Sequence, residues 1–160
     1  MDEKTIEKVV ASVIEQMNQK PNKMTLKLAT ALIEAVEKKA KDMGMSIVAA
    51  VSDASGRPVA IHCMDGAYIG SFDVALNKTY TSIAFKMSTE KLGTLAQPGE
   101  SLYGIQFTNE GKIVIFGGGE PLVVKGEIIG ALGVSGGSAV QDTELAAYGK
   151  AMFEEVISWQ

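Results

Sequence analysis

The main candidate for a chemically functional side chain in this sequence is a single histidine. His62 is the only histidine, and it lies in the alternating stretch at residues 59–64. Side chains two positions apart share a face of a strand, so we expect His62 and Met64 on one side and Cys63 on the other. One axial His, Met, Cys or Tyr ligand can hold a haem iron when a largely apolar pocket contributes the remaining affinity. His62, Met64 and Tyr68 are therefore candidate tetrapyrrole-binding residues, with His62 as the metal ligand.

Other chemistries that depend on histidine find less support. An ordinary zinc site needs several protein ligands, so zinc at His62 would require carboxylates or another subunit. A Ser-His-Asp triad would also have to use His62, and the sequence has no Gly-x-Ser-x-Gly elbow to expose a serine. The competing interpretation of His62 is a structural or half-exposed side chain without a ligand.

Two glycine-rich segments supply further candidates. Residues 133–138 lead from a strand into a helix, where free amides and the helix dipole favour an anion. The three glycines at residues 117–119 favour positive φ or the close approach of a ligand or subunit. Neither segment matches a phosphate-binding loop or a dinucleotide fingerprint. Plain turns remain the alternative in both segments. The candidate ligand-binding positions are Gly117, Gly118, Gly136 and Gly137.

Lys78 is the candidate cation. It falls in a helix expected at about residues 71–86, capped by Ser71, where Lys78 and Thr81 could present polar groups on one side. A solvated helix face is the competing interpretation of these residues.

The elements that position these side chains follow from hydrophobic periodicity and turn signals. Tight turns are expected at residues 53–56 and 125–126, and Ser138 with Gln141 matches the capping box at a helix start, where Asp142 suits the helix dipole. Helices are expected at residues 25–43, 71–86, 88–95 and 138–157, and strands at residues 46–53, 57–64, 112–116, 121–125 and 127–134. Residues 97–110 are expected to form a structured loop. Because each apolar face needs a partner layer, the sequence predicts an α/β (α+β) fold in which helices cover a five-stranded antiparallel sheet.

The first residues form a separate unit in this interpretation. Apolar side chains recur at helical spacing through residues 6–17, and Pro21 ends the pattern within a polar run. We therefore expect an amphipathic helix and linker at residues 1–23, followed by one domain at residues 24–160.

Composition limits the protein class. The 160 residues are 46% hydrophobic, which is enough for one core. The single cysteine, Cys63, and the lack of a signal-like segment favour a reducing, cytoplasmic setting. No apolar run approaches the roughly 20 residues that span a membrane. The net charge of -4 comes without a basic stripe, so nucleic acid is not an expected partner.

Several spaced blocks of the sequence resemble one known family. The blocks are DASGRPVAIHCMDGA, GSFDVALNKTYTSIAF and GKIVIFGGGEPLVVKGEIIGALGVSGGS, followed by QD. In this order they closely resemble the family that contains GlcG, the haem-binding HbpS and the PduO C-terminal domain, over about residues 24–157. TSIAFKMST, LAQPGESLYGIQ and GKIVIFGGGEPL look most like the PduO branch.

The resemblance implies a profilin-like fold, self-association into dimers or larger assemblies, and haem or a corrinoid such as cobalamin as the ligand. PduO proteins carry a cobalamin adenosyltransferase domain before this one, so adenosyl transfer is not expected of this chain. The N-terminal segment resembles the encapsulation peptides of bacterial microcompartments, which implies docking to shell or cargo through residues 3–17. The alternative is that the apolar face of this N-terminal helix covers the domain's own core or a dimer partner.

Three hypotheses follow. The first is a microcompartment-associated accessory protein, cytoplasmic or inside the compartment, that binds a tetrapyrrole near His62, Met64 and the glycine loops. The second is an enzyme that degrades haem or modifies a small metabolite, with His62 as acid or base. The third is a structural module that assembles with itself and with cargo. A binding protein is favoured over an enzyme.

Overall fold

The computed structural model describes residues 22–158, so the helix expected before Pro21 lies outside the described residues. The described chain contains one antiparallel sheet with the strand order β2-β1-β4-β3. The strands are β1 (Val48–Asp53), β2 (Pro58–Cys63), β3 (Gly119–Val124) and β4 (Glu127–Ser135). The helices are α2 (Leu26–Asp42), α3 (Ser71–Phe85), α4 (Thr89–Leu95), α5 (Ala139–Ser158) and the 3-10 turns η1 (Ile105–Phe107) and η2 (Asn109–Gly111).

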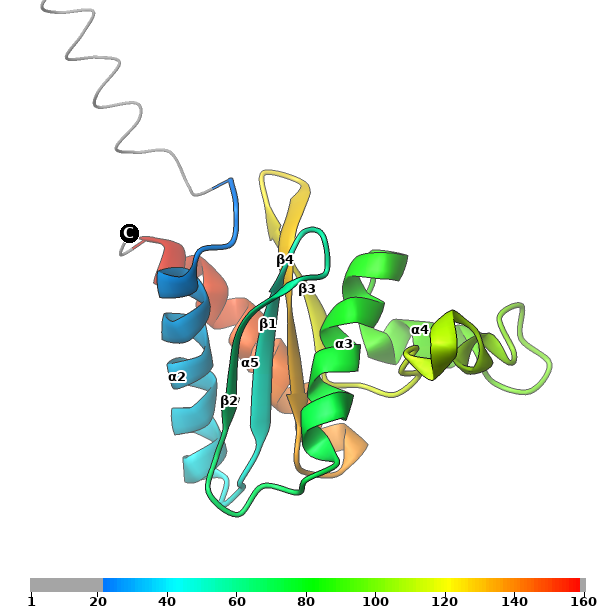
Figure 1. Cartoon of the computed structure of the whole chain (residues 1–160), viewed down its shortest axis with the longest axis horizontal. Coiled ribbons are helices and arrows are strands. Elements are labelled where there is room, and N and C mark those ends of the chain that lie inside the picture. The colour runs from blue at the N-terminus through cyan, green and yellow to red at the C-terminus, as the bar shows by residue number, and fades with distance from the viewer. Residues whose placement is uncertain (1–21, 159–160) are drawn as a thin grey trace, which may run out of the picture.

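Helices cover both faces of the sheet (Figure 1). α2 and α5 pack together on one face, where the larger hydrophobic core includes Leu32, Leu132 and Phe153. α3 packs on the other face, where Ala75 contacts the smaller cluster of Val48 and Ala50. Alternate side chains of β1 are therefore buried against the α2–α5 layer and against α3. The predicted α/β (α+β) class with an antiparallel sheet under helices is confirmed.

The strand expected at residues 112–116 is wrong. The Val114 amide donates to Thr81 Oγ1 of α3 at 3.0 Å, which replaces a bond to a neighbouring strand. The carbonyl of Ile115 lies so close to Gly93 of α4 that a Cβ on this glycine would overlap it. The apolar residues of this segment therefore pack against helices, and the described sheet has four strands instead of five.

The turn chemistry is confirmed at both hairpins. Asp53 Oδ1 accepts the amides of Ser55 and Arg57 between β1 and β2, and Gly56 has a φ of +79°. The turn between β3 and β4 places Lys125 and Gly126 at positive φ. These turns fix the register within each hairpin, and the pairing of β1 with β4 leaves β2 and β3 at opposite edges of the sheet.

The predicted helix ends are confirmed for α5 and corrected for α3. Ser138 and Gln141 form the expected reciprocal capping box, in which each backbone amide donates to the other side chain. Gly70 is the N-cap of α3, and the hydroxyl of Ser71 instead pairs with the Ser135 hydroxyl of β4 at 3.0 Å. This bond joins the start of α3 to the end of β4.

α3 lies unusually close to β4. A Cβ on Gly133 would fall 2.0 Å from the Ala75 carbonyl oxygen, so only glycine permits this approach. A buried hydrogen bond of 2.6 Å between the Ser52 and Thr79 hydroxyls ties α3 to β1. These contacts hold the middle of α3, and with it Lys78, firmly against the sheet.

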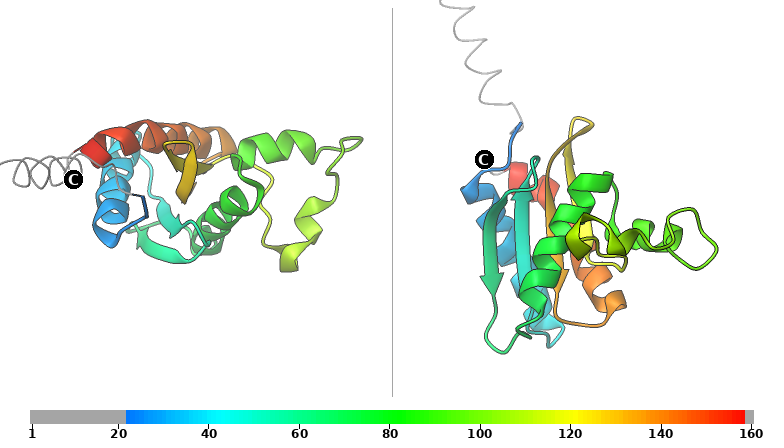
Figure 2. Two further views of the ribbon diagram at one scale, coloured as in Figure 1. Left: turned by 90° about the horizontal axis from the view of Figure 1, so that it is seen from above. Right: turned by 45° about the vertical axis from the view of Figure 1, so that its right-hand side comes forward.

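α4 and the chain that follows it extend away from the body on the side of α3 opposite to α2 (Figure 2). The loop expected at residues 97–110 contains the 3-10 turn η1, and η2 begins at its end. Tyr103 and Phe107 are 66% and 83% exposed in this projection. Between residues 22 and 158, no helix combines the length and apolarity needed to cross a membrane.

Candidate functional site

His62 lies on the edge strand β2, opposite Ala49 of β1. Its side chain faces α2, where Nδ1 lies 3.2 Å from Glu37 Oε1. The imidazole is 35% exposed and the Glu37 side chain is 20% exposed. Met64 shares this face and packs against the α2–α5 core, whereas Ile61 packs toward α3. The predicted alternation along β2 is thus confirmed.

The contact with Glu37 defines which nitrogen of His62 is available. In the neutral imidazole, an Nδ1 proton donated to the Glu37 carboxylate leaves the lone pair on Nε2. Metal-binding histidines are commonly oriented in this way by a carboxylate behind the ring. The contact between His62 and Glu37 is therefore compatible with the predicted role of His62 as a metal ligand.

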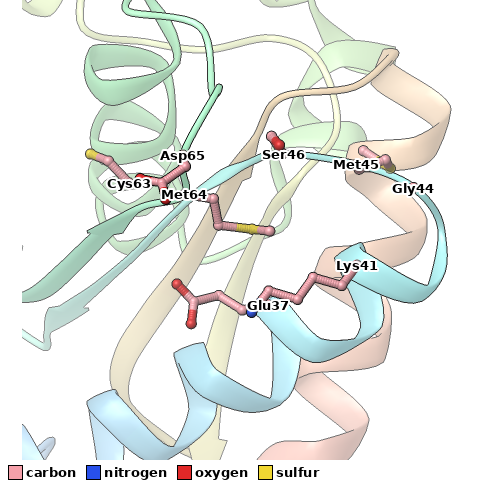
Figure 3. A pocket seen from close by; sticks show the side chains of 8 residues that line it. All are labelled: Glu37, Lys41, Gly44, Met45, Ser46, Cys63, Met64 and Asp65. Atoms are coloured by element: carbon pink, nitrogen blue, oxygen red, sulfur yellow. The ribbon is translucent and has the colours of Figure 1, made fainter.

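A cavity of about 520 Å³ opens beside Glu37, between the end of α2 and the end of β2, and His62 is not among its lining residues. Figure 3 shows Met64 extending toward α2, while the sulfur of Cys63 points away from Glu37. The side chains of Lys41 and Asp65 bring opposite charges to the wall. The full lining is Glu37, Lys41, Gly44, Met45, Ser46, Cys63, Met64 and Asp65.

Tyr68 does not line this cavity. It lies in the connection between β2 and α3, where its side chain is 74% exposed next to the exposed Ile69 and Phe72. Its backbone carbonyl accepts the Ser71 amide at the start of α3. The structure therefore places Tyr68 on an exposed apolar surface and gives it no contact with His62.

Lys78 is fully buried, contrary to the solvated helix face that was its alternative interpretation. Nζ donates to the Val134 carbonyl at 2.7 Å and to Asp142 Oδ2 at 2.9 Å. It also lies 5.0 Å from the centre of the Phe116 ring. Burial lowers the pKa of Lys78 below its usual range, and the opposing effect of Asp142 is smaller.

Gly118 and Gly137 lie beside this buried ion pair, whereas Gly117 and Gly136 have other neighbours. Gly118 has a φ of +113°, and a Cβ there would lie 2.5 Å from Lys78 Nζ. A Cβ on Gly117 would lie 1.8 Å from Thr143 Oγ1. The Gly137 amide donates to Asp142 Oδ1 at 2.9 Å, so this amide is already satisfied by the chain. A Cβ on Gly136 would overlap the backbone at Ser46.

The candidates therefore form two groups and not one groove. His62 and Met64 lie on the α2 side of the sheet, whereas Lys78 comes from α3 on the other side and meets the glycine loops at the start of α5. Gly117 lines a second, separate cavity. None of these placements tests ligand binding, so the roles of the predicted residues remain predictions.

Three residues that complete these groups were missed from the sequence. Glu37 lies 25 positions before its partner His62, and Asp142 lies 64 positions after Lys78. Phe116 was assigned to a strand, which hid its contact with Lys78. Asp142 had a partial signal, because an acidic residue follows the capping box, but that signal concerned the helix dipole.

Comparison with known proteins places the described domain among relatives. Residues 24–151 match the family described as Haem degrading protein HbpS-like. An uncharacterized 15.0 kDa protein from the dhaT-dhaS intergenic region of Citrobacter freundii is 42% identical over 133 residues, which cover 83% of this chain and 94% of the relative. The corrinoid adenosyltransferase PduO of Salmonella typhimurium is 37% identical over 115 residues, or 72% of this chain. This match spans only 34% of PduO.

Two solved structures share both fold and sequence. The Klebsiella pneumoniae protein ORFY has a TM-score of 0.81 and 40% identity, with 86% of this chain and 94% of that chain covered. A PduOC:heme complex has a TM-score of 0.73 and 37% identity, with 75% of this chain and 87% of that chain covered. The predicted resemblance to the HbpS family, close to the PduO C-terminal domain, is confirmed.

Proposed function

Because this chain belongs to the HbpS-like family, we propose that it is an accessory protein that binds a tetrapyrrole, either haem or a corrinoid, through His62. The observation that carries the proposal is the half-exposed imidazole whose Nδ1 lies 3.2 Å from the Glu37 carboxylate. This contact prepares Nε2 to bind a metal. The likeness to a PduOC:heme complex supports the same ligand class.

The donor set at this site fits an iron or cobalt tetrapyrrole better than a bare metal ion. The described residues contain no group of three or more His, Cys, Asp and Glu side chains that could hold a metal. A tetrapyrrole brings four nitrogen ligands of its own, so one imidazole from the protein is sufficient. When bound, it would supply a redox-active metal centre.

The neighbouring cavity has groups that suit the rest of such a ligand. Met64 offers an apolar surface and a thioether on the same face as His62. Lys41 brings a cation to the cavity wall, which suits a carboxylate substituent of a tetrapyrrole. Lys41 and Met64 would therefore contact a tetrapyrrole held by His62.

Haem and corrinoids are separated by parallel titration. The purified full chain is titrated with haemin and, separately, with cob(II)alamin while visible absorbance is recorded. We expect a saturable shift with one ligand per chain for at least one of them. The absence of a saturable shift with either would contradict tetrapyrrole binding and favour the assembly module.

A catalytic role is the second candidate, because the matched family is described as haem degrading. In this case Nε2 of His62 would act as an acid or base beside bound haem. Haem breakdown appears as a loss of Soret absorbance after a reductant and oxygen are added to the haem-loaded protein. Full activity in His62→Ala would contradict this role.

Association with a microcompartment and with other copies of the chain belongs to the same proposal. Residues 3–17 would dock as an amphipathic segment on a shell or cargo protein. The exposed apolar side chains Tyr68, Ile69 and Phe72 support self-association, because such groups are commonly covered in an assembly. Sedimentation of the purified chain measures the size of the homo-oligomer.

A further inference from the structure

A second cavity lies on the far side of the molecule from His62. It measures about 350 Å³, is open to solvent, and is lined by α4, the segment that precedes β3, and the start of α5. Ile115, Phe116 and Val140 make part of its wall apolar, and Thr143 adds a hydroxyl. We call it the Phe116 groove. Its size suits a small organic molecule.

A buried amine lies directly behind this groove. Phe116 lines the groove, is 45% exposed, and has its ring centre 5.0 Å from Lys78 Nζ. Lys78 itself has no exposed surface. One partly exposed aromatic side chain therefore stands between the groove and the ammonium group. A rotation of the Phe116 side chain would bring Nζ into contact with a molecule in the groove.

The surroundings of Lys78 also suit a reactive amine. A lysine becomes nucleophilic when its proton is removed, and a desolvated site favours the neutral form. Asp142 Oδ2 lies 2.9 Å from Nζ and can accept this proton. The Val134 carbonyl, at 2.7 Å, holds the nitrogen in place. Burial lowers the pKa of Lys78, which agrees with this geometry.

We propose that Lys78 is an aldehyde-reactive amine, and that the Phe116 groove takes small apolar aldehydes and holds them as an imine on Nζ. This activity is independent of tetrapyrrole binding at His62. The apolar wall formed by Ile115, Phe116 and Val140 selects the aldehyde chain. Phe116 acts as the gate.

The reaction needs no reagent beyond the aldehyde. Asp142 accepts a proton from the ammonium group, and the Nζ lone pair attacks the carbonyl carbon. A proton passes from the attacking nitrogen to the carbonyl oxygen, which gives a neutral carbinolamine. The C–O bond then breaks, the hydroxyl leaves as water with a proton from Asp142, and a C=N bond forms. The imine nitrogen is protonated and keeps the positive charge, so the buried Asp142 carboxylate retains its counter-ion.

The test is reductive trapping with localisation of the label. The folded full chain is incubated with hexanal and sodium cyanoborohydride, and peptide mapping by mass spectrometry follows the adduct at each lysine. We expect Lys78 to be labelled before Lys91, which is exposed on α4. Labelling of the exposed lysines while Lys78 stays unmodified would overturn the proposal.

Variants of the gate provide the second readout. Phe116→Ala is expected to raise the initial labelling rate of Lys78 about tenfold, equivalent to about 1.4 kcal/mol of lost ring contact. Phe107→Ala is the matched control, because Phe107 is 83% exposed and does not line the groove. Phe116→Leu keeps an apolar side chain if the alanine variant folds poorly. An unchanged rate at Lys78 in a folded Phe116 variant would also overturn the proposal.

Discussion

At the residue scale, the environment of each titratable group decides what it can do. His62 is partly exposed and has one carboxylate partner, so a ring nitrogen remains available for a ligand. Lys78 is fully buried and is held by Asp142 and the Val134 carbonyl. The arrangement of His62 suits the binding of a metal that arrives from solvent. The arrangement of Lys78 keeps its amine buried behind the Phe116 side chain.

Glu37 is expected to tune the metal that His62 holds. Glu37→Gln keeps the size of the side chain but removes its charge, so His62 becomes a less basic ligand. Loss of such a partner typically weakens metal binding by roughly 10- to 100-fold. We expect weaker haemin binding and a higher reduction potential of the haem-loaded protein, measured by titration and spectroelectrochemistry.

Glu34→Gln is the matched control for this variant. Glu34 is exposed on the same helix, and its replacement by glutamine removes the same negative charge. Equal effects of the two substitutions would show that only the net charge matters, which contradicts the positioning role of Glu37.

Gly118 is expected to be essential for the buried ion pair. Gly118→Ala strains a φ of +113° and places a Cβ 2.5 Å from Lys78 Nζ. Strain and disruption of a buried pair together should lower the free energy of unfolding by about 2 to 4 kcal/mol. Urea denaturation measures this loss.

Gly99→Ala separates strain from the clash with Lys78. Gly99 also has a positive φ, of +90°, but a Cβ there would meet nothing within 4 Å. A clearly smaller loss of stability is expected for this variant. Similar losses for both would argue against a steric role of Gly118 beside Lys78.

The sequence located these residues more readily than it located their partners. Strand alternation was enough to place His62 and Met64 on one face, because it depends only on neighbours along the chain. The contacts with Glu37 and Asp142 join residues 25 and 64 positions apart. Such pairs depend on how α2, α3 and α5 pack, which no local pattern specifies.

At the element scale, local signals succeeded where an element makes its own hydrogen bonds. The turn at residues 53–56 and the capping box of α5 are satisfied within a few residues, and both were predicted. Residues 112–116 carry a strand-like apolar run, but their partners are α3 and α4. Periodicity indicated burial there and could not identify the neighbouring element.

The turn between β1 and β2 is expected to lose stability in Asp53→Ala. Asp53 Oδ1 accepts bonds from the Ser55 amide, the Ser55 hydroxyl and the Arg57 amide. Removal of these bonds should cost about 1 to 2 kcal/mol of unfolding free energy at neutral pH. Chemical denaturation of the two proteins measures the difference.

The wild type and Asp53→Ala also test how the unfolding free energy depends on pH. The hydrogen bond from the Ser55 hydroxyl is the main reason that the pKa of Asp53 lies below its ordinary value of 3.8. A carboxyl with a lowered pKa stabilises the fold above 3.8, and this contribution disappears as pH falls through the folded-state pKa. The stability difference should therefore narrow only in acid. A constant difference down to the most acidic pH would contradict the assignment.

At the scale of the whole molecule, the described residues form a continuous hydrophobic core. The main hydrophobic cluster runs from Met24 to Ile157, and the family match covers residues 24–151. We expect that a chain starting at residue 22 keeps the thermal stability of the full chain. A large drop in its melting temperature would indicate that the N-terminal segment covers the domain's own core.

The proposed docking role of the N-terminal segment is tested by transfer. Residues 1–21 are fused to a fluorescent protein in cells that assemble microcompartment shells. We expect discrete fluorescent foci that coincide with the shells, because an apolar helical stripe would bind them. Replacement of Ile6, Val9 and Val13 by aspartate should abolish the foci. Diffuse fluorescence of the unmodified fusion would contradict targeting.

Ligation of a tetrapyrrole metal by His62 is tested most directly by haemin titration of His62→Ala beside the wild-type chain, with and without added imidazole. We predict a saturable Soret shift in the wild type, its loss in the variant, and its partial return when imidazole occupies the vacated position. Circular dichroism verifies that the variant is folded. The same spectrum and affinity in a folded His62→Ala protein would contradict the account.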